Sequence, residues 1–93
     1  MATSFNLILP ESFKKIIKKL EKKDRELYAR LEEKMIDVGN NPYIGKPLRN
    51  VLKNRWRIHF GSFVLIYRIN EEEKEVRFLD FDHHDKIYKN PLK

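Results

Sequence analysis

Residues 55–69, RWRIHFGSFVLIYRI, carry the pattern that most constrains the fold of this 93-residue chain. Polar and apolar side chains alternate strictly from Arg55 to Phe60, which is the period of a β-strand with one buried face and one face in water. Gly61 and Ser62 interrupt the pattern as a tight turn would, and a second apolar run follows. The segment therefore predicts a β-hairpin whose apolar face needs another layer to cover it.

The rest of the chain predicts that layer. Residues 11–22 repeat apolar side chains at helical spacing with lysines on the opposite side, and Asp24 is suited to cap a second amphipathic helix. Gly39 and the Asn-Asn-Pro sequence after it end the second helix. The other expected elements are a short strand at 5–9, strands at 55–60, 63–69 and 75–81, a shorter strand near 48–52, and one or two helical turns from Asp82 through Tyr88.

These elements predict an α+β fold in one domain spanning residues 1–93. A two-helix hairpin packs on one face of a small antiparallel sheet, in the order β-α-α-β-β-β with a short C-terminal helical turn. Alternation assigns seven side chains to the face under the helices: Trp56, Ile58, Phe60, Phe63, Leu65, Tyr67 and Ile69. The opposite, uncovered face then receives Arg57, His59, Val64, Ile66 and Arg68.

Composition limits the chemistry and the compartment. The chain has no cysteine, so disulfides and thiolate metal sites are excluded. Its first ten residues lack the charged region and the long apolar run of a signal peptide, and no apolar run approaches membrane-spanning length. We expect a cytoplasmic protein that does not engage a membrane.

The distribution of charge indicates a polyanionic partner. Twenty lysines and arginines outnumber fourteen acids, and no acid occurs between Asp37 and Glu71. The lysines of residues 14–23 are interleaved with acids and are typical of a solvated helix surface, whereas the acid-free stretch is harder to explain that way. Its basic residues are Lys46, Arg49, Lys53, Arg55, Arg57, His59 and Arg68.

Two segments of the chain resemble the RelE/ParE superfamily of toxins from toxin–antitoxin systems: PLRNVLKNRWRIHFGSFVLIYRI at 47–69 and FLDFDHHDKIY at 78–88. The similarity covers nearly the whole chain, including the helical hairpin. It implies a toxin that a cognate, RelB-like antitoxin neutralises within a hetero-oligomeric complex. RelE-like members are ribosome-dependent endoribonucleases that cut mRNA, whereas ParE-like members share the fold and poison DNA gyrase.

The resemblance also implies site residues. RelE-type enzymes place basic residues at the two outward positions of the first hairpin strand, here Arg57 and His59, and an arginine near the C-terminus where this chain has His84. The tyrosine implicated near the 2′-hydroxyl of the RNA matches Tyr88. An arginine that commonly grips the scissile phosphate is replaced by Val64. The implied site is thus recognisable but altered.

Metal-free RNA cleavage needs a base for the 2′-hydroxyl, an acid for the 5′-oxygen and cations for the phosphorane. We hypothesise that His59 and His84 are the acid–base pair, in either assignment, with Arg57 stabilising phosphate charge and Tyr88 orienting the 2′-hydroxyl or acting as another base. No metal or cofactor is expected, because the acids and histidines of residues 80–85 lack ligand spacing. RNA contacts are expected from Lys46, Arg49, Lys53, Arg55 and Arg68.

Structural interpretations of the same residues stay open. His59 alone would be an ordinary outward strand residue, Tyr88 a packing residue, and Arg55 and Lys53 surface charges or antitoxin contacts. Three functions therefore remain: a ribosome-dependent endoribonuclease, a gyrase inhibitor without chemistry of its own, and a catalytically inactive relative that binds the antitoxin. The histidines favour the first function, and the loss of arginine at Val64 favours the third.

Overall fold

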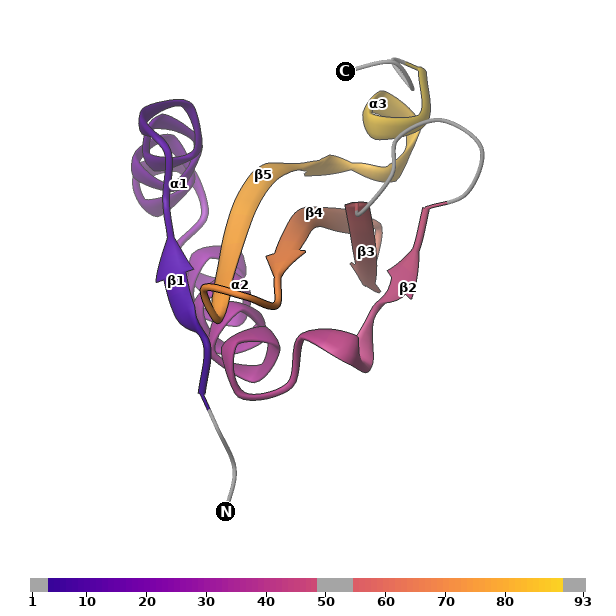
Figure 1. Cartoon of the computed structure of the whole chain (residues 1–93). Helices are drawn as coiled ribbons and strands as arrows, with labels where there is room; N and C mark the ends of the chain where they lie inside the picture. Colours follow the sequence, from indigo (N-terminus) through magenta and orange to yellow (C-terminus); the bar gives the residue numbers. More distant parts are fainter. Residues whose placement is uncertain (1–3, 49–54, 90–93) are drawn as a thin grey trace.

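The computed structural model describes residues 4–48 and 55–89, with the backbone alone for Tyr88 and Lys89 (Figure 1). The elements follow the predicted order, with a turn of 3-10 helix and a two-residue strand added: β1 (Asn6–Ile8), α1 (Glu11–Lys23), α2 (Arg25–Asn40), η1 (Pro42–Ile44), β2 (Lys46–Pro47), β3 (Arg55–Phe60), β4 (Phe63–Asn70), β5 (Glu75–His83) and α3 (His84–Lys89). The predicted fold class is confirmed. Most of the strand expected near 48–52 lies outside the described residues.

The two long helices form an antiparallel hairpin on one side of the sheet (Figure 1). Asp24 makes the short connection between them. Its backbone N–H donates to the Leu20 carbonyl at 2.8 Å, which ends α1, and its carboxylate accepts from the Leu27 N–H at 3.0 Å, which caps α2. The predicted cap is therefore confirmed. None of the helices in the described part of the chain is long and apolar enough to span a membrane.

The sheet has the strand order β1-β5-β4-β3-β2. Strands β2 to β5 pair antiparallel, as expected, but β1 pairs parallel to β5, so the sheet is mixed and the expectation of a wholly antiparallel sheet is wrong in this respect. Tight turns force neighbouring strands to be antiparallel, whereas nearly the whole chain separates β1 from β5 and leaves its direction to packing. The start of β1 is fixed by two backbone bonds, from Phe5 N–H to the Gly39 carbonyl and from Asn6 N–H to the Lys74 carbonyl, both 2.8 Å.

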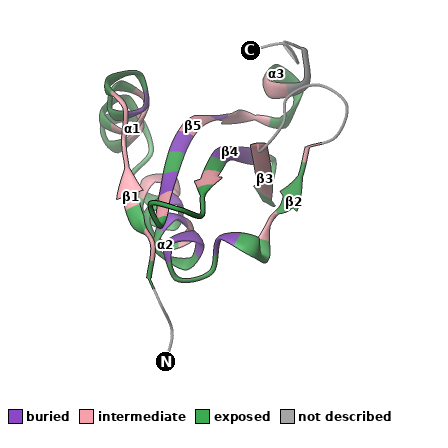
Figure 2. Cartoon of the chain, viewed as in Figure 1, coloured by how far each residue is buried: buried purple, intermediate pink, exposed green. Residues whose placement is uncertain are grey.

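The core lies between the helices and the inner face of the sheet, and Figure 2 shows buried residues concentrated in α2, β4 and β5. The inner-face assignment from alternation is confirmed, since all seven predicted side chains belong to this core or pack against it. An irregularity in β5 completes the arrangement. Ile66 pairs with Asp80 and the next residue, Tyr67, pairs with Phe78, so Leu79 is an extra residue in the ladder. This bulge turns Phe78 into the core and Arg77 outward.

The outer face of the sheet is not fully open to solvent. Val64 is fully buried and Ile66 is 7% exposed, although both lie on the face away from the helical hairpin. Helix α3 folds back at this end of the sheet and contacts β4 and β5 (Figure 1). Val64 and Ile66 of β4 therefore form a short apolar floor between the charged groups of β3 and those of β5.

Candidate functional site

The strand register arranges the outer face in rows, each crossing β3, β4 and β5. The first row is His59, Val64 and Asp82; the second is Arg57, Ile66 and Asp80, extended by Lys46 of β2 opposite Arg57; the third is Arg55, Arg68 and Arg77. The first two rows combine His59 and Arg57 on β3 with acids on β5 across an apolar centre. The third row contains arginines alone. We call the third row the arginine row.

The fold brings His59 and His84 together although 24 residues lie between them in the sequence. Their ring centroids lie 5.6 Å apart, with the ring planes tilted by 39°. The hairpin turn makes this possible: Gly61 takes a positive φ of 61°, and the carbonyl of Ser62 then accepts the backbone N–H of His84 at 2.7 Å. Helix α3 therefore starts against the turn that ends His59's own strand. We call these two residues the histidine pair.

The electrostatics of the histidine pair favour a neutral imidazole at His59. The pKa of His59 is lowered from its ordinary value. Partial loss of hydration around the ring is the largest cause, and neighbouring positive charges lower the pKa further: Arg57, His84 and Lys46. A histidine held neutral at neutral pH can accept a proton, so His59 has the property required of a general base.

The two adjacent histidines diverge. His83 ends β5, its ring packs edge-on against Phe63 with centroids 5.5 Å apart, and its Nδ1 accepts the backbone N–H of Asp85 at 3.3 Å. His84 begins α3 and faces His59, with its Nδ1 lying 3.4 Å from the Asp85 carboxylate. Only one of the two rings therefore belongs to the histidine pair, and His83 serves as a neighbour of the same chemistry outside it.

The other predicted site residues are only partly placed. Arg57 lies on the same strand and face as His59, two residues away, and Lys46 lies opposite Arg57. Tyr88 is in α3 one turn beyond His84, but its side chain lies outside the described part of the structure, so its role stays a prediction. Arg49 and Lys53 also lie outside the described residues.

Arg55 and Arg68 are not next to the histidine pair. Arg68 shares a strand face with Val64 and lies four residues along β4, about 13 Å at the rise of a strand. It is opposite Arg55 on one side and Arg77 on the other. Arg68 is thus a member of a separate charged row and does not take the place of the arginine missing at Val64.

Sequence reasoning missed the acids of this face. The stretch from 38 to 70 has none, but folding brings Asp80 and Asp82 of β5 opposite Ile66 and Val64, one strand away from Arg57 and His59. Alternation within residues 80–83 carries a signal for both acids facing outward. The bulge at Leu79 hides the outward position of Arg77, because it reverses the alternation before that point. Within residues 4–48 and 55–89, no three histidine or acidic side chains gather as a metal site would require.

Comparison with known proteins agrees with this architecture. The family model described as "ParE toxin of type II toxin-antitoxin system, parDE" matches residues 7–88. The chain is 43% identical to "Putative toxin RelE4" of Methanocaldococcus jannaschii over 83 residues, 88% of this chain and 87% of the relative. Among solved structures, a chain of the toxin–antitoxin complex RelBE2 of Mycobacterium tuberculosis superposes with a TM-score of 0.77 at 26% identity, covering 87% of this chain and 99% of that one.

The isolated RelE toxin of Escherichia coli shares the fold, with a TM-score of 0.75 at 20% identity and 96% of each chain covered. The match of the family model extends over nearly all of the described residues, and the relative from M. jannaschii matches almost as much of the chain. Sequence and structure therefore agree on one conclusion. This chain belongs to the RelE/ParE family of toxins of type II toxin–antitoxin systems.

Proposed function

We propose that this toxin cleaves translated mRNA on the ribosome without a metal ion, and that a cognate antitoxin neutralises it in a hetero-oligomeric complex. The observation that carries the proposal is the histidine pair beside Arg57 on the outer face. Two imidazoles 5.6 Å apart supply groups that can accept and donate protons near neutral pH. Fixed positive charge lies on the same strand two residues away.

The proposed reaction assigns one role to each group. His59, whose pKa is lowered, takes the proton of the 2′-hydroxyl, and the 2′-oxygen attacks the adjacent phosphorus. The bond from phosphorus to the 5′-oxygen breaks as His84 donates a proton to that oxygen, which leaves a 2′,3′-cyclic phosphate and a 5′-hydroxyl. Arg57 stabilises the charge of the phosphorane, and Tyr88 orients the 2′-hydroxyl.

Because position 64 is a valine, neighbouring residues have to supply the positive charge that would bind the scissile phosphate. A buried apolar side chain there supplies no charge to a phosphate, so the cations of the second row must do so. Lys46 lies opposite Arg57 across β2 and β3 and is the second cation that the register provides. Further along the RNA, backbone contacts are proposed for Arg49, Lys53, Arg55 and Arg68.

Dependence on the ribosome follows from how few groups the site offers. In-line attack needs the 2′-oxygen, the phosphorus and the leaving oxygen held in one geometry, and flexible RNA seldom adopts it. A ribosome that holds the mRNA supplies this alignment. Inhibition would come from an acidic or amphipathic antitoxin segment that folds onto the basic face. The M. tuberculosis relative of similar fold was solved as a toxin–antitoxin complex, which supports such a partner.

Gyrase inhibition is the second candidate function, because the family model that matches the chain is named for ParE toxins. A gyrase inhibitor needs a docking surface but no proton-transfer groups. The two functions therefore differ in how much they require of the histidine pair.

The deciding experiment is expression of the toxin without antitoxin, followed by mapping of 5′ ends on cellular mRNA. Cuts in phase with the reading frame, absent in His59→Gln and present in His83→Gln, are expected. His83→Gln is the matched control, since it removes the neighbouring imidazole that faces Phe63. Intact mRNA with DNA damage, unchanged in both variants, would assign the protein to gyrase inhibition. Purified toxin should cut ribosome-bound mRNA far faster than free RNA, and its slow cleavage of free RNA should persist in excess EDTA.

A further inference from the structure

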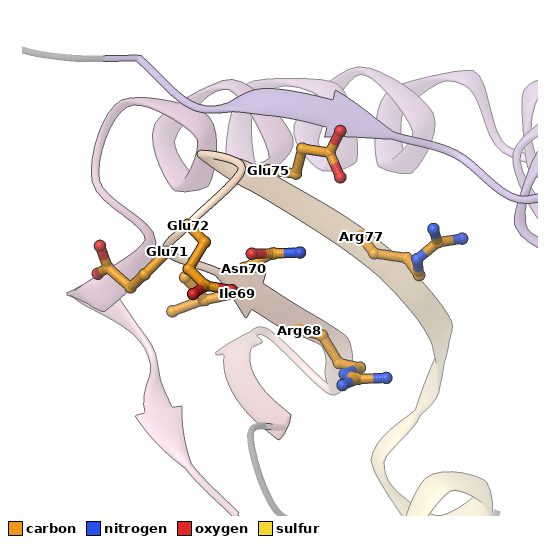
Figure 3. A pocket seen from close by; sticks show the side chains of 7 residues that line it. All are labelled: Arg68, Ile69, Asn70, Glu71, Glu72, Glu75 and Arg77. Atoms are coloured by element: carbon orange, nitrogen blue, oxygen red, sulfur yellow. The ribbon is translucent and has the colours of Figure 1, made fainter.

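The arginine row is the strongest charged feature outside the histidine pair. Arg68 of β4 lies directly between Arg55 of β3 and Arg77 of β5 in the ladder, and all three alternate to the outer face. Arg68 and Arg77 are exposed and line a surface pocket of about 530 Å³ at the end of the sheet away from α3 (Figure 3). Among the described residues, none of these three guanidinium groups forms an ion pair.

This arrangement costs folding free energy. Like charges directly opposite one another on neighbouring strands repel, and three arginines in one row contain two such pairs. The bulge at Leu79 is what brings Arg77 into the row. Arrangements that cost stability persist where a ligand uses them, and guanidinium groups in a plane are suited to bind the paired oxygens of phosphate groups.

The rest of the pocket directs an anion toward one side. The side-chain oxygen of Asn70 accepts the backbone N–H of Glu73 at 3.1 Å, which leaves its amide nitrogen to face the pocket as a donor. Figure 3 shows Arg68 and Arg77 extending to one end of the pocket and Glu71 and Glu72 lying at the other, while Glu75 lies on β5 two residues before Arg77. An extended polyanion is therefore repelled from the turn after β4 and drawn along the sheet toward α3.

We propose that the arginine row is a second RNA-binding site, which holds a backbone phosphate of the same strand whose scissile bond lies at the histidine pair. This inference rests on the proposed function. It adds Arg77, places the contact about 13 Å along β4 from Val64, and separates it from the reacting centre. Continuity favours RNA as the occupant, because both sites lie on one face of the same three strands. The row contains no aromatic side chain, and contacts to backbone phosphates carry no sequence information, so the contact is independent of base sequence.

The test measures binding of a fluorescein-labelled single-stranded RNA in which every 2′-hydroxyl is methylated. Cleavage is impossible on this probe, so the result does not depend on nuclease activity. Binding by fluorescence anisotropy over a series of salt concentrations gives the slope of log K against log salt, about 0.7 per phosphate neutralised on a single strand. The double variant Arg68→Gln/Arg77→Gln should bind more weakly and lose about 0.7 of slope, the amount for the one phosphate that the row holds.

Two further variants make the result specific. Arg25→Gln/Arg30→Gln removes the same charge from exposed positions of α2, on the layer that covers the opposite face, and should leave the slope unchanged. Glu72→Gln/Glu75→Gln removes negative charge from the pocket and should tighten RNA binding. Equal slopes for the row variant and the α2 variant would overturn the proposal. So would weaker binding of the antitoxin with unchanged RNA binding, which would assign the row to an acidic protein partner.

If Arg68→Gln/Arg77→Gln lowers the salt slope of RNA binding while the wild-type toxin cuts no mRNA in cells, the RNA site stands and the nuclease proposal fails. If the wild-type toxin cuts mRNA and the row variant keeps the full slope, the nuclease proposal stands and the RNA site fails. The two proposals therefore fail separately.

Discussion

The two faces of the sheet are built by the same strands under the same alternation, yet they differ in almost every physical property. The inner face joins the helices in a core that includes the fully buried Leu65, Tyr67 and Phe78. The outer face alternates with it residue by residue and carries cations, acids and a histidine around a small apolar floor. The comparison teaches that core packing and surface charge are assigned to separate side chains, although these side chains alternate along one strand.

The largest expected effect is on the outer face. His59→Gln and His84→Gln should each slow single-turnover cleavage of ribosome-bound mRNA by about 10²–10⁴-fold, the range for loss of a general acid or base. Unfolding by urea should hardly change, because neither ring belongs to the core. For the wild type, activity should fall as the pH drops through the pKa of His59, and this acidic limb should lie below the ordinary histidine value of about 6.5, since burial and nearby cations lower it.

His59→Gln should abolish the acidic limb, whereas His83→Gln should leave both the rate and the limb in place. A wild-type rate in both pair variants across the pH range would remove the chemical distinction between the two faces. His59 would then be a polar strand residue and no more.

The matching change on the inner face is Phe78→Ala. Phe78 is fully buried and stacks on Phe13 with ring centroids 5.6 Å apart. The ring centroid of Tyr67 lies 6.2 Å from that of Phe78. Its truncation leaves a cavity between the sheet and α1 and should lower the free energy of unfolding by about 3–5 kcal/mol. Urea denaturation measures this loss, and Ile36→Ala at an exposed position of α2 is the control, expected within about 0.5 kcal/mol of wild type. A loss at Phe78 no larger than the control would contradict the proposed core.

An intermediate effect is expected at the hydroxyl of Tyr67, which is buried and hydrogen-bonded on the inner face. The hydroxyl of Tyr67 donates to the Pro42 carbonyl at 2.7 Å, so Tyr67→Phe should cost about 1–3 kcal/mol by leaving that carbonyl unsatisfied. Burial raises the pKa of Tyr67 to about 12. The folded state therefore keeps the proton more tightly than the unfolded state, and this contribution to stability should be lost as the pH rises from about 10 through 12. The phenylalanine variant should lack that alkaline loss.

The inner face could be predicted from the sequence because burial imposes a period. Three strands and two helices begin and end near the expected residues, and Asp24 forms the expected cap. The direction of β1 could not be predicted, since no short turn ties it to its neighbour. The same is true of Arg77, because a single extra residue at Leu79 reverses the alternation before it.

The outer face was predictable only in part, because it depends on contacts between distant segments. The proximity of His59 and His84 was expected from a family resemblance, and the structure supplies its cause in the bond from His84 to the Ser62 carbonyl. Asp80 and Asp82 were overlooked, since counting acids along the chain says nothing of the strand that pairs alongside. The charge of a sheet face has to be counted over all the strands that pair side by side, and not along the sequence alone.

The smallest expected effect has the opposite sign and would sharpen the comparison most. Arg68→Gln removes the central member of the arginine row and relieves its repulsion with both Arg55 and Arg77, so it should raise the free energy of unfolding by about 0.2–1 kcal/mol. The gain should shrink as salt screens exposed charges. Urea denaturation at low and high salt measures it, with Arg30→Gln on α2 as the control for loss of one exposed arginine. A destabilised Arg68→Gln protein would mean that the row supports the fold. An Arg68→Gln protein that is more stable and also binds RNA more weakly would mean that the outer face keeps its charge at the expense of stability. The core residues of the inner face, by contrast, contribute to stability by their burial.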